Sequence, residues 1–236
     1  EDGTPLKSTQ IPVMVHHRTV ALLEFWGKGD QVFGAPLIQS MNVVAGIIAR
    51  QIRHEETKLQ IQYLKDKDQI RREIEQEISG QSEPQAAFAA LAGALRSHLG
   101  GEIVTLFWFR TDRSSMSRFT VANERVLAEH GLEMADDYSV GGWVAAHKSP
   151  VLITDASEST MVRLDAQLAA AGIRSVVAAP LWQGDSIAGC LTLGGMGTRV
   201  FNHRHLEILT DCAPSAAHLG LQFIQTRTLD RQQRSI

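Results

Sequence analysis

The hydrophobic pattern in the first third of the chain changes from the period of a strand to the period of a helix. Two apolar, β-branched runs at residues 11–15 and 19–26 are separated by a short polar turn, which predicts a β-hairpin. From there the apolar residues recur at intervals of three and four, as on one face of a helix: Leu37, Met41, Val44, Ile48 and Ile52. This stripe continues more weakly to Ile78 without an intervening proline, so we expect one long helix over residues 36–78.

The rest of the chain predicts shorter elements of both kinds. Strands are expected at residues 102–110, 116–122, 151–154, 175–182 and 186–193, and helices at residues 84–99, 141–147 and 203–226, with a helical and loop segment at residues 156–172. Pro214 lies inside the last helix, where a proline costs about 3 kcal/mol. We therefore expect a kink or a break at this position.

One unit of this pattern occurs twice. When Pro12 is set against Pro180, the two stretches align without a gap through a hairpin, a loop and a helix. The matched pairs include Leu23 with Leu191, Gly27 with Gly195, Gly29 with Gly197, Val32 with Val200, Phe33 with Phe201, Ala45 with Ala213 and Ala49 with Ala217. A repeat at a fixed offset indicates a duplicated structural unit. We therefore expect one complete domain, preceded by the end of another domain of the same kind.

The long helix and the first hairpin both need a partner. The helix is polar apart from an a/d-like apolar seam, which predicts pairing with the same helix of a second chain. A solvated single helix is the alternative, because the seam weakens at Asp66 and Lys67. The apolar face of the hairpin also requires cover, from its own helix or from a second chain, since an isolated hairpin is marginally stable. That face consists of Val13, Val15, Val20 and Leu22.

Composition limits the partners and the compartment. The net charge is −3 with both signs mixed along the chain, so no basic surface for nucleic acid is expected. No apolar run approaches the roughly 20 residues of a membrane span, so no membrane contact is expected. Residues 1–10 are too polar for a signal peptide. The two cysteines, Cys190 and Cys212, predict buried thiols in a reducing cytoplasm rather than a disulfide framework.

Several segments together resemble the GAF domain, a sensory and regulatory family. They are residues 141–155 (GGWVAAHKSPVLITD), residues 174–180 (RSVVAAP), residues 187–193 (IAGCLTL), and Phe201 followed by the amphipathic helix at residues 203–223. The resemblance implies an α+β fold: an antiparallel sheet with helices packed on one face, plus a long helical linker. It also implies a ligand pocket on the other face of the sheet, beneath a roof formed by residues 156–173.

The resemblance divides the chain into four parts. Residues 1–52 are expected to be the C-terminal part of one GAF-like domain, a hairpin plus a helix. Residues 53–82 are expected to be a connecting helix like a coiled coil, residues 83–226 a GAF-like sensory domain, and residues 227–236 an outgoing helix or tail.

The implied function is that of a non-enzymatic regulatory sensor in a bacterial-type signal-transduction protein. It would dimerise in parallel through the long helix and relay the state of a small ligand to an output domain outside this chain, such as a histidine kinase or a cyclase. A purely structural dimerisation module without a ligand is the alternative.

The candidate pocket residues are those that such a fold would place around the roof. Asp155 ends a strand at the pocket rim, two arginines flanking the roof suit a carboxylate or phosphate, and aromatic side chains would form apolar walls. The full set is Trp108, Phe119, Trp143, Asp155, Arg163, Arg174 and Trp182. No catalytic or metal-binding residue is expected, and the sequence names no cofactor.

Other chemistries known in the GAF family have less support in these residues. The polar pairs of the cyclic-nucleotide class are not recognisable near Phe201, and the roof has no cysteine to carry a bilin. A haem or iron site would depend on His130 or His147. A thiol enzyme would depend on Cys190 and Cys212, which the pattern places within a strand and on a helix.

Overall fold

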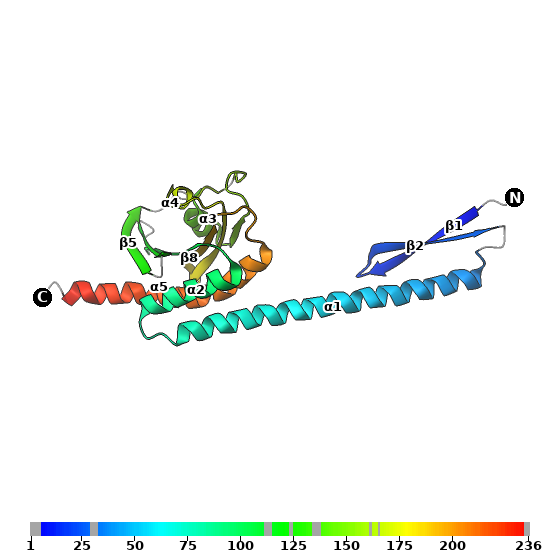
Figure 1. The fold of residues 1–236 in the computed structure, drawn as a ribbon, viewed down its shortest axis with the longest axis horizontal. Coiled ribbons are helices and arrows are strands. Elements are labelled where there is room, and N and C mark those ends of the chain that lie inside the picture. Colours follow the sequence, from blue (N-terminus) through cyan, green and yellow to red (C-terminus); the bar gives the residue numbers. More distant parts are fainter. Residues whose placement is uncertain are drawn as a thin grey trace. The chain divides into compact units, whose positions relative to one another are not determined.

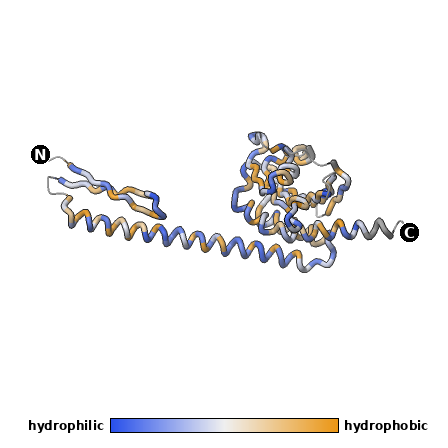
Figure 2. Tube along the Cα trace, turned by 180° about the vertical axis from the view of Figure 1, so that it is seen from behind, coloured by the Kyte–Doolittle hydropathy of each residue, from blue (hydrophilic) through white to orange (hydrophobic). Residues whose placement is uncertain are grey.

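The computed structural model describes residues 6–28, 33–110, 115–122, 125–133, 138–160, 162–164 and 166–233. The chain divides into two compact units, Glu1–Asp66 and Lys67–Ile236. Helix α1 (Ala35–Ser79) begins in the first unit and ends in the second, as one helix of 45 residues (Figure 1). The single long helix expected from the apolar stripe is therefore confirmed. Figure 2 shows that hydrophobic and hydrophilic residues alternate along it.

The first unit is a two-stranded antiparallel ribbon packed on the first part of α1. Its strands are β1 (Leu6–Val15) and β2 (Arg18–Lys28). Three residues of β1 are buried against three residues of α1, and together they form a small core: Ile11, Val13, Val15, Met41, Ala45 and Ala49. The helix of the same chain thus covers Val13 and Val15, whereas Val20 and Leu22 of β2 remain exposed.

The pairing of this ribbon reproduces the pairing of a second ribbon, β7 (Ser175–Gln183) with β8 (Ser186–Gly195), at the offset of the sequence repeat. Pro12 lies opposite Leu22, and Pro180 lies opposite Cys190. In both ribbons the register shifts after the residue that follows the proline. The helix that follows each ribbon begins at the same displacement, at Ala35 for α1 and at His203 for α5 (His203–Gln233).

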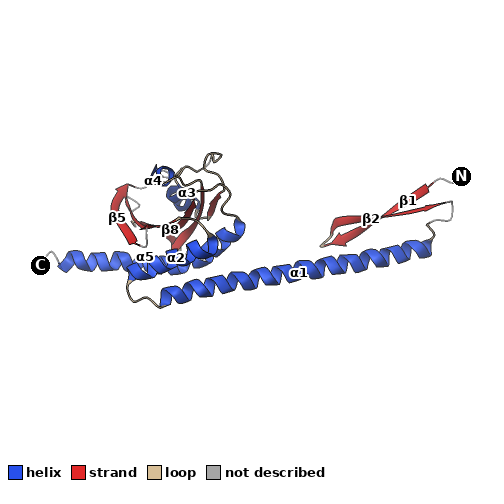
Figure 3. Cartoon of the chain, in the orientation of Figure 1, coloured by secondary structure: helices blue, strands red, loops and turns tan. Residues whose placement is uncertain are grey.

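The second unit is built on a six-stranded sheet with the order β5-β4-β3-β8-β7-β6, in which all neighbours are antiparallel (Figure 3). The remaining strands are β3 (Ile103–Phe109), β4 (Ser115–Ala122), β5 (Arg125–Glu133) and β6 (Val151–Ile153). The remaining helices are α2 (Pro84–Leu99), α3 (Val140–His147) and α4 (Ala166–Ala170). This is the α+β fold that the sequence predicts.

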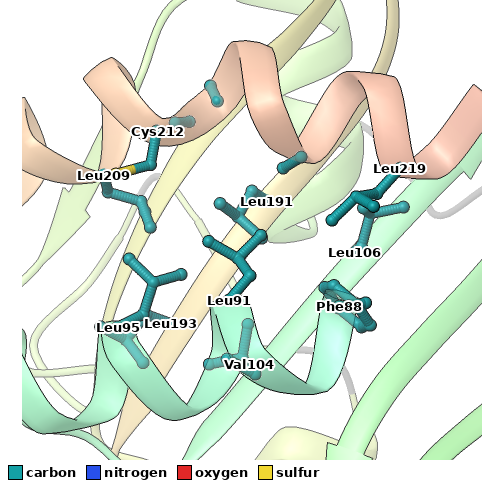
Figure 4. Packing of buried hydrophobic residues seen from close by; sticks show 14 of the residues in the cluster. Phe88, Leu91, Leu95, Val104, Leu106, Leu191, Leu193, Leu209, Cys212 and Leu219 are labelled. Atoms are coloured by element: carbon teal, nitrogen blue, oxygen red, sulfur yellow. The ribbon is translucent and has the colours of Figure 1, made fainter. Parts of the chain in front are cut away.

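Helices α2 and α5 pack on one face of the sheet. Figure 4 shows their apolar side chains meeting those of β3 and β8: Phe88, Leu91, Leu95, Val104, Leu106, Leu191, Leu193, Leu209, Cys212 and Leu219. The last part of α1 joins this layer, because Ile74 is buried in the same core. Lys67 of α1 forms ion pairs with Glu207 and Asp211 of α5, at 3.4 and 3.0 Å.

The opposite face of the sheet is covered by α3 and the segment that contains α4. A second apolar core fills this side, with Phe107 from β3, Cys190 from β8, Val144 from α3, and Leu168 and Ile173 from the covering segment. Since both faces are covered, each central strand contributes residues to two separate cores.

One strand was missed by the sequence prediction, and one of the two alternatives for Pro214 does not occur. Strand β5 was not predicted, because its apolar residues are few and charged residues interrupt them, as is typical of an edge strand. Helix α5 is one element through Pro214 and is not split there. Pro214 is exposed, and its neighbours Ala213 and Ala216 are buried against the sheet, so tertiary packing holds the helix together on both sides of the proline. Among the described residues, no helix is both long and apolar enough to cross a membrane.

Candidate functional site

The aromatic and charged residues proposed from the sequence do not form one site. Trp108 of β3 and Phe119 of β4 belong to the core beneath α2 and α5, on the face opposite the roof. Phe119 stacks on Phe223 of α5 with ring centroids 4.4 Å apart. Trp108 also lines a cavity of about 400 Å3 near the end of α5, together with Ile224 and Arg227. The structure therefore places these two aromatic rings away from the expected pocket.

The other two candidate tryptophans lie at or near the surface of the second unit. Trp182 is exposed near the end of β7. Trp143 on α3 is half-buried and stacks on His147, with ring centroids 4.3 Å apart. The Nδ1 atom of His147 also lies 3.0 Å from the carbonyl oxygen of Trp143. Both contacts hold His147 against its own helix, at the surface.

The three charged candidates gather at the base of the roof. Arg174 donates a hydrogen bond from Nη2 to Asp155 at 3.2 Å. Arg163 and Arg174 both line an open cavity of about 340 Å3, together with Val162 and Ile173 of the same segment. The pKa of Asp155 is lowered, first by hydrogen bonds from the hydroxyl and the backbone N–H of Ser157 and then by the charge of Arg174. Asp155 and Arg174 thus form an ion pair with each other at the two ends of the roof.

A different cavity, of about 180 Å3, lies between the sheet and the covering segment. Its lining comes from β3, β4 and the region of α4: Ile103, Thr105, Phe107, Arg118, Thr120, Leu168 and Ala171. None of these residues was among those proposed from the sequence. This cavity occupies the place where the sequence predicted a pocket, on the side of the sheet away from α2 and α5.

Threonine side chains form a polar strip along the sheet at this cavity. Thr105 lies opposite Thr120 on β4 and opposite Thr192 on β8. The hydroxyl oxygens of Thr105 and Thr120 are 3.3 Å apart, and the Thr192 hydroxyl donates to the carbonyl oxygen of Thr105 at 3.2 Å. The strip brings hydroxyl groups to an otherwise apolar interior, where polar groups need hydrogen-bond partners.

Arg118 is the one strongly charged side chain in this lining. It lies opposite Glu129 on β5, and its side chain is 10% exposed against 48% for Glu129. Its Nε atom donates to Oε2 of Glu129 at 2.6 Å, and Nη2 donates to the same oxygen. A guanidinium buried this deeply needs a negative partner, because the loss of one partner of a buried ion pair leaves an uncompensated charge. Glu129 provides that partner from the edge of the sheet.

The alternation of side chains between the two faces of β4 is a sequence signal from which Arg118 could have been found. In residues 115–122, Phe119 and Val121 are buried beneath the helices, so Arg118 and Thr120 must point to the opposite face. An arginine on a strand whose two faces are both covered indicates a buried charge. The covering of both faces had to be assumed before this signal was recognisable.

The two cysteines are not arranged as a reactive centre would require. Cys190 lies in the core beneath the roof and Cys212 in the core beneath the helices, so the sheet separates the two sulfur atoms. Burial raises the pKa of Cys212 to about 12, with a further contribution from the nearby charge of Asp211. Within the described ranges, no group of three or more His, Cys, Asp or Glu side chains is arranged to hold a metal ion.

The family model of the GAF domain matches residues 83–218. This chain belongs to the GAF domain family. The matched residues contain the whole six-stranded sheet, α2, the covering segment and the first part of α5. A search of curated proteins finds no match.

Solved structures share this GAF fold at low sequence identity. The GAF domain of a phosphoenolpyruvate-protein phosphotransferase from Coxiella burnetii has a TM-score of 0.53 and 16% identity, covering 70% of this chain and 96% of that one. The corresponding domain from Acinetobacter has a TM-score of 0.54 and 11% identity, covering 69% and 97%. A free methionine-R-sulfoxide reductase from Neisseria meningitidis, in complex with its substrate, has a TM-score of 0.52 and 15% identity, covering 68% and 91%. At these identities the likeness concerns the fold alone.

Proposed function

We propose that this chain is a regulatory sensor module of a signal-transduction protein, and that a small ligand binds in the cavity between β3, β4 and α4. GAF domains act as sensory and regulatory modules in signalling proteins. The observation that carries the proposal is the buried Arg118 in the lining of an apolar cavity with a strip of threonine hydroxyls. An apolar pocket with a few placed polar groups is the usual composition of a ligand site.

The sheet offers a route from this cavity to the helices. On β3, Thr105 and Phe107 line the cavity, whereas the alternate residues Val104 and Leu106 pack beneath α2 and α5. A shift of β3 on ligand binding therefore changes the packing of both helices. The end of α1 belongs to the same layer through Ile74 and Lys67. We propose that α1 and α5 relay the state of the cavity to an output domain.

The first unit, in our proposal, is the C-terminal part of a second GAF domain. Its ribbon has the register, the register shift and the following helix of β7, β8 and α5 at one constant offset. In the second unit the counterpart ribbon is flanked by β3 and β6. At this offset the exposed Leu22 of β2 corresponds to Cys190, which is buried beneath the covering segment in the second unit, so Leu22 fits a face that such a segment would cover.

We propose that α1 forms a parallel homodimer with the same helix of a second chain. Three apolar residues in the middle of α1 are well exposed in the single chain: Leu59, Ile61 and Leu64, at 70%, 48% and 51%. Ile61 and Leu64 are three residues apart, which is a spacing of a and d positions in a helix–helix seam, whereas Leu59 lies beside that line. Pairing would also connect the relay of one chain to that of the other.

We also propose that the two thiols have no catalytic role. A thiol enzyme needs a thiolate, and burial of Cys212 opposes its ionisation. The sheet between Cys190 and Cys212 also prevents a disulfide between them. Both cysteines are buried and neither is part of a disulfide, which fits the reducing cytoplasm proposed for this chain.

Ligand-induced stabilisation tests the sensor function against a purely structural module. We would screen small metabolites by thermal unfolding of the full chain, of Ala171→Leu and of Ala146→Leu. Ala171 lines the cavity, so a larger side chain there fills it, whereas Ala146 is exposed on α3 and serves as the control. A ligand that raises the Tm of the wild type and of Ala146→Leu but not of Ala171→Leu supports the proposal. Failure of every metabolite to raise the Tm would favour the structural module.

A further inference from the structure

We infer that the ligand of this cavity is a small carboxylate, and that Arg118 binds its charged end. The inference rests on the proposed sensor function and names the chemical class that the cavity accepts. Three features of the described residues carry it: the charge of Arg118, the size of the cavity and the position of Glu129.

The hydrogen bonds to Glu129 do not use all the N–H donors of the Arg118 guanidinium. Among the described residues, Glu129 is the group that accepts from it, through Nε and Nη2. Nη1 takes no part in these hydrogen bonds, and a guanidinium carries five N–H donors in a fixed planar fork. Since Arg118 lines the cavity, an anionic group there gains charge-assisted hydrogen bonds that a neutral ligand gains only weakly.

The size and the walls of the cavity favour a compact ligand with an apolar part. Its volume of about 180 Å3 is smaller than the roughly 300–1,000 Å3 of pockets that hold drug-sized ligands. The hydroxyls of Thr105 and Thr120 lie beside Arg118, and Ile103, Phe107 and Leu168 provide apolar walls. A short aliphatic carboxylate matches this arrangement, with its oxygens at the guanidinium and hydroxyls and its chain against the walls.

Glu129 acts as an internal competitor for such a ligand. Its carboxylate occupies two of the three nitrogen atoms of the guanidinium, yet its side chain is about half exposed and lies on the edge strand β5. A bound carboxylate that takes over Arg118 releases Glu129 to water at little cost. Ligand binding thereby loosens the link between β4 and β5, which is a change that the edge of the sheet can transmit.

Binding of simple carboxylates to the full chain tests the inference. The probes are acetate, propionate and butyrate, and the comparison compounds are propionamide and inorganic phosphate. Binding is measured at constant ionic strength by calorimetry and by thermal unfolding. The variants are Arg118→Gln, Glu129→Gln and Thr120→Val. Arg53→Gln is the matched control, because Arg53 is an exposed arginine of the first unit.

We expect propionate or butyrate to bind the wild type and Arg53→Gln equally. Arg118→Gln should weaken binding by about tenfold or more, since hydrogen bonds to charged groups are strong. Glu129→Gln should strengthen binding by severalfold, because it removes the competing carboxylate. If Arg118→Gln fails to fold, Glu129→Gln and Thr120→Val, which should weaken binding severalfold, carry the test.

Other outcomes overturn the inference. Equal binding of propionamide, or binding that Arg118→Gln leaves unchanged, would show a ligand pocket without anion recognition, and the sensor function would stand. Binding of phosphate but not of carboxylates would also refute the ligand class. If none of the probes binds but another metabolite stabilises the wild type and not Ala171→Leu, only the inference fails. If nothing binds at all, both proposals fail.

Discussion

The carboxylate of Asp155 lies 3.2 Å from Nη2 of Arg174, and this ion pair joins the two ends of the roof segment. Beside it, the backbone N–H of Ala156 donates to the carbonyl oxygen of Arg174 at 2.7 Å. The segment between them contains α4, and Leu168 of α4 lines the small cavity. The pair therefore closes the base of the segment that covers the candidate site.

The hydrogen bonds of Asp155 from Ser157, together with this ion pair, predict a pH dependence of stability. The lowered pKa of Asp155 means that its ionised form stabilises the folded state at every pH above its ordinary value, about 4. The contribution is lost as the pH falls through the lowered pKa. We expect Asp155→Asn to lower the Tm at pH 7, and the difference from wild type to shrink below about pH 4. Asp185→Asn, in the exposed turn between β7 and β8, should have no such effect. A difference that persists at low pH would contradict the assignment to the charge.

Close packing of α5 on the sheet predicts a contrast between two helical glycines. A Cβ atom added at Gly220 of α5 would overlap the ring atoms Cε3 and Cζ3 of the buried Trp108, whereas one at Gly93 of α2 would meet nothing within 4 Å. We expect Gly220→Ala to destabilise the protein by about 1–3 kcal/mol through overpacking. Gly93→Ala should stabilise it by about 0.5–1 kcal/mol, since alanine favours the helix. Urea unfolding of both variants measures the contrast, and equal effects would refute the packing.

The two thiols should be unreactive in the folded protein. Burial raises the pKa of Cys212 to about 12, and Cys190 is fully buried. We expect a thiol-labelling reagent at pH 8 to modify neither cysteine in native conditions and both in denaturant. The single variants Cys190→Ala and Cys212→Ala assign the two rates. Rapid labelling of either thiol in the native protein would reopen the enzyme hypothesis.

The dimer proposed for α1 depends on its exposed apolar residues. We expect light scattering to show a dimer for the wild type, and the combined variant Leu59→Gln, Ile61→Gln and Leu64→Gln to shift the mass to the monomer. Glutamine keeps a good helix propensity, so circular dichroism should be unchanged. Leu127→Gln, an exposed leucine on β5, is the control. A monomeric wild type would leave α1 as a solvated helix.

The orientation of that dimer is a separate matter. In a parallel pair in register, equivalent residues of two chains meet, so Ile61→Cys should form a disulfide between chains under mild oxidation. An antiparallel pair would not bring this position against itself unless the crossing point lay there.

The first unit predicts unequal effects from two valines of the same ribbon. Val13 is fully buried against α1, whereas Val20 is exposed. We expect Val13→Ala to lower the free energy of opening of β1 and β2 by about 2 kcal/mol, measured by amide hydrogen exchange, and Val20→Ala to change it little. Exchange in the wild type as fast as in a free peptide would show that the ribbon does not pack on α1.

Local sequence signals predicted most of the fold because they depend on neighbours along the chain. The three-and-four spacing of apolar residues located α1, and Pro84 with the glycines after Leu99 bounded α2. The repeat around Pro12 and Pro180 predicted two equivalent ribbons, and their registers match. Strand β5 was not predicted, because an edge strand buries few residues and its hydrophobic alternation is therefore weak.

The site could not be predicted in the same way. Phe107 and Trp108 are adjacent aromatic residues on β3, and both are buried. Phe107 lines the cavity and Trp108 packs beneath α5, yet nothing in their local sequence distinguishes the two sides. The sequence by itself determined most of the elements, the repeat and the family, because periodicity and spacing are local properties. Only the tertiary structure decided which side chains share the cavity, because both faces of β3 are covered, and the cover comes from segments far away along the chain.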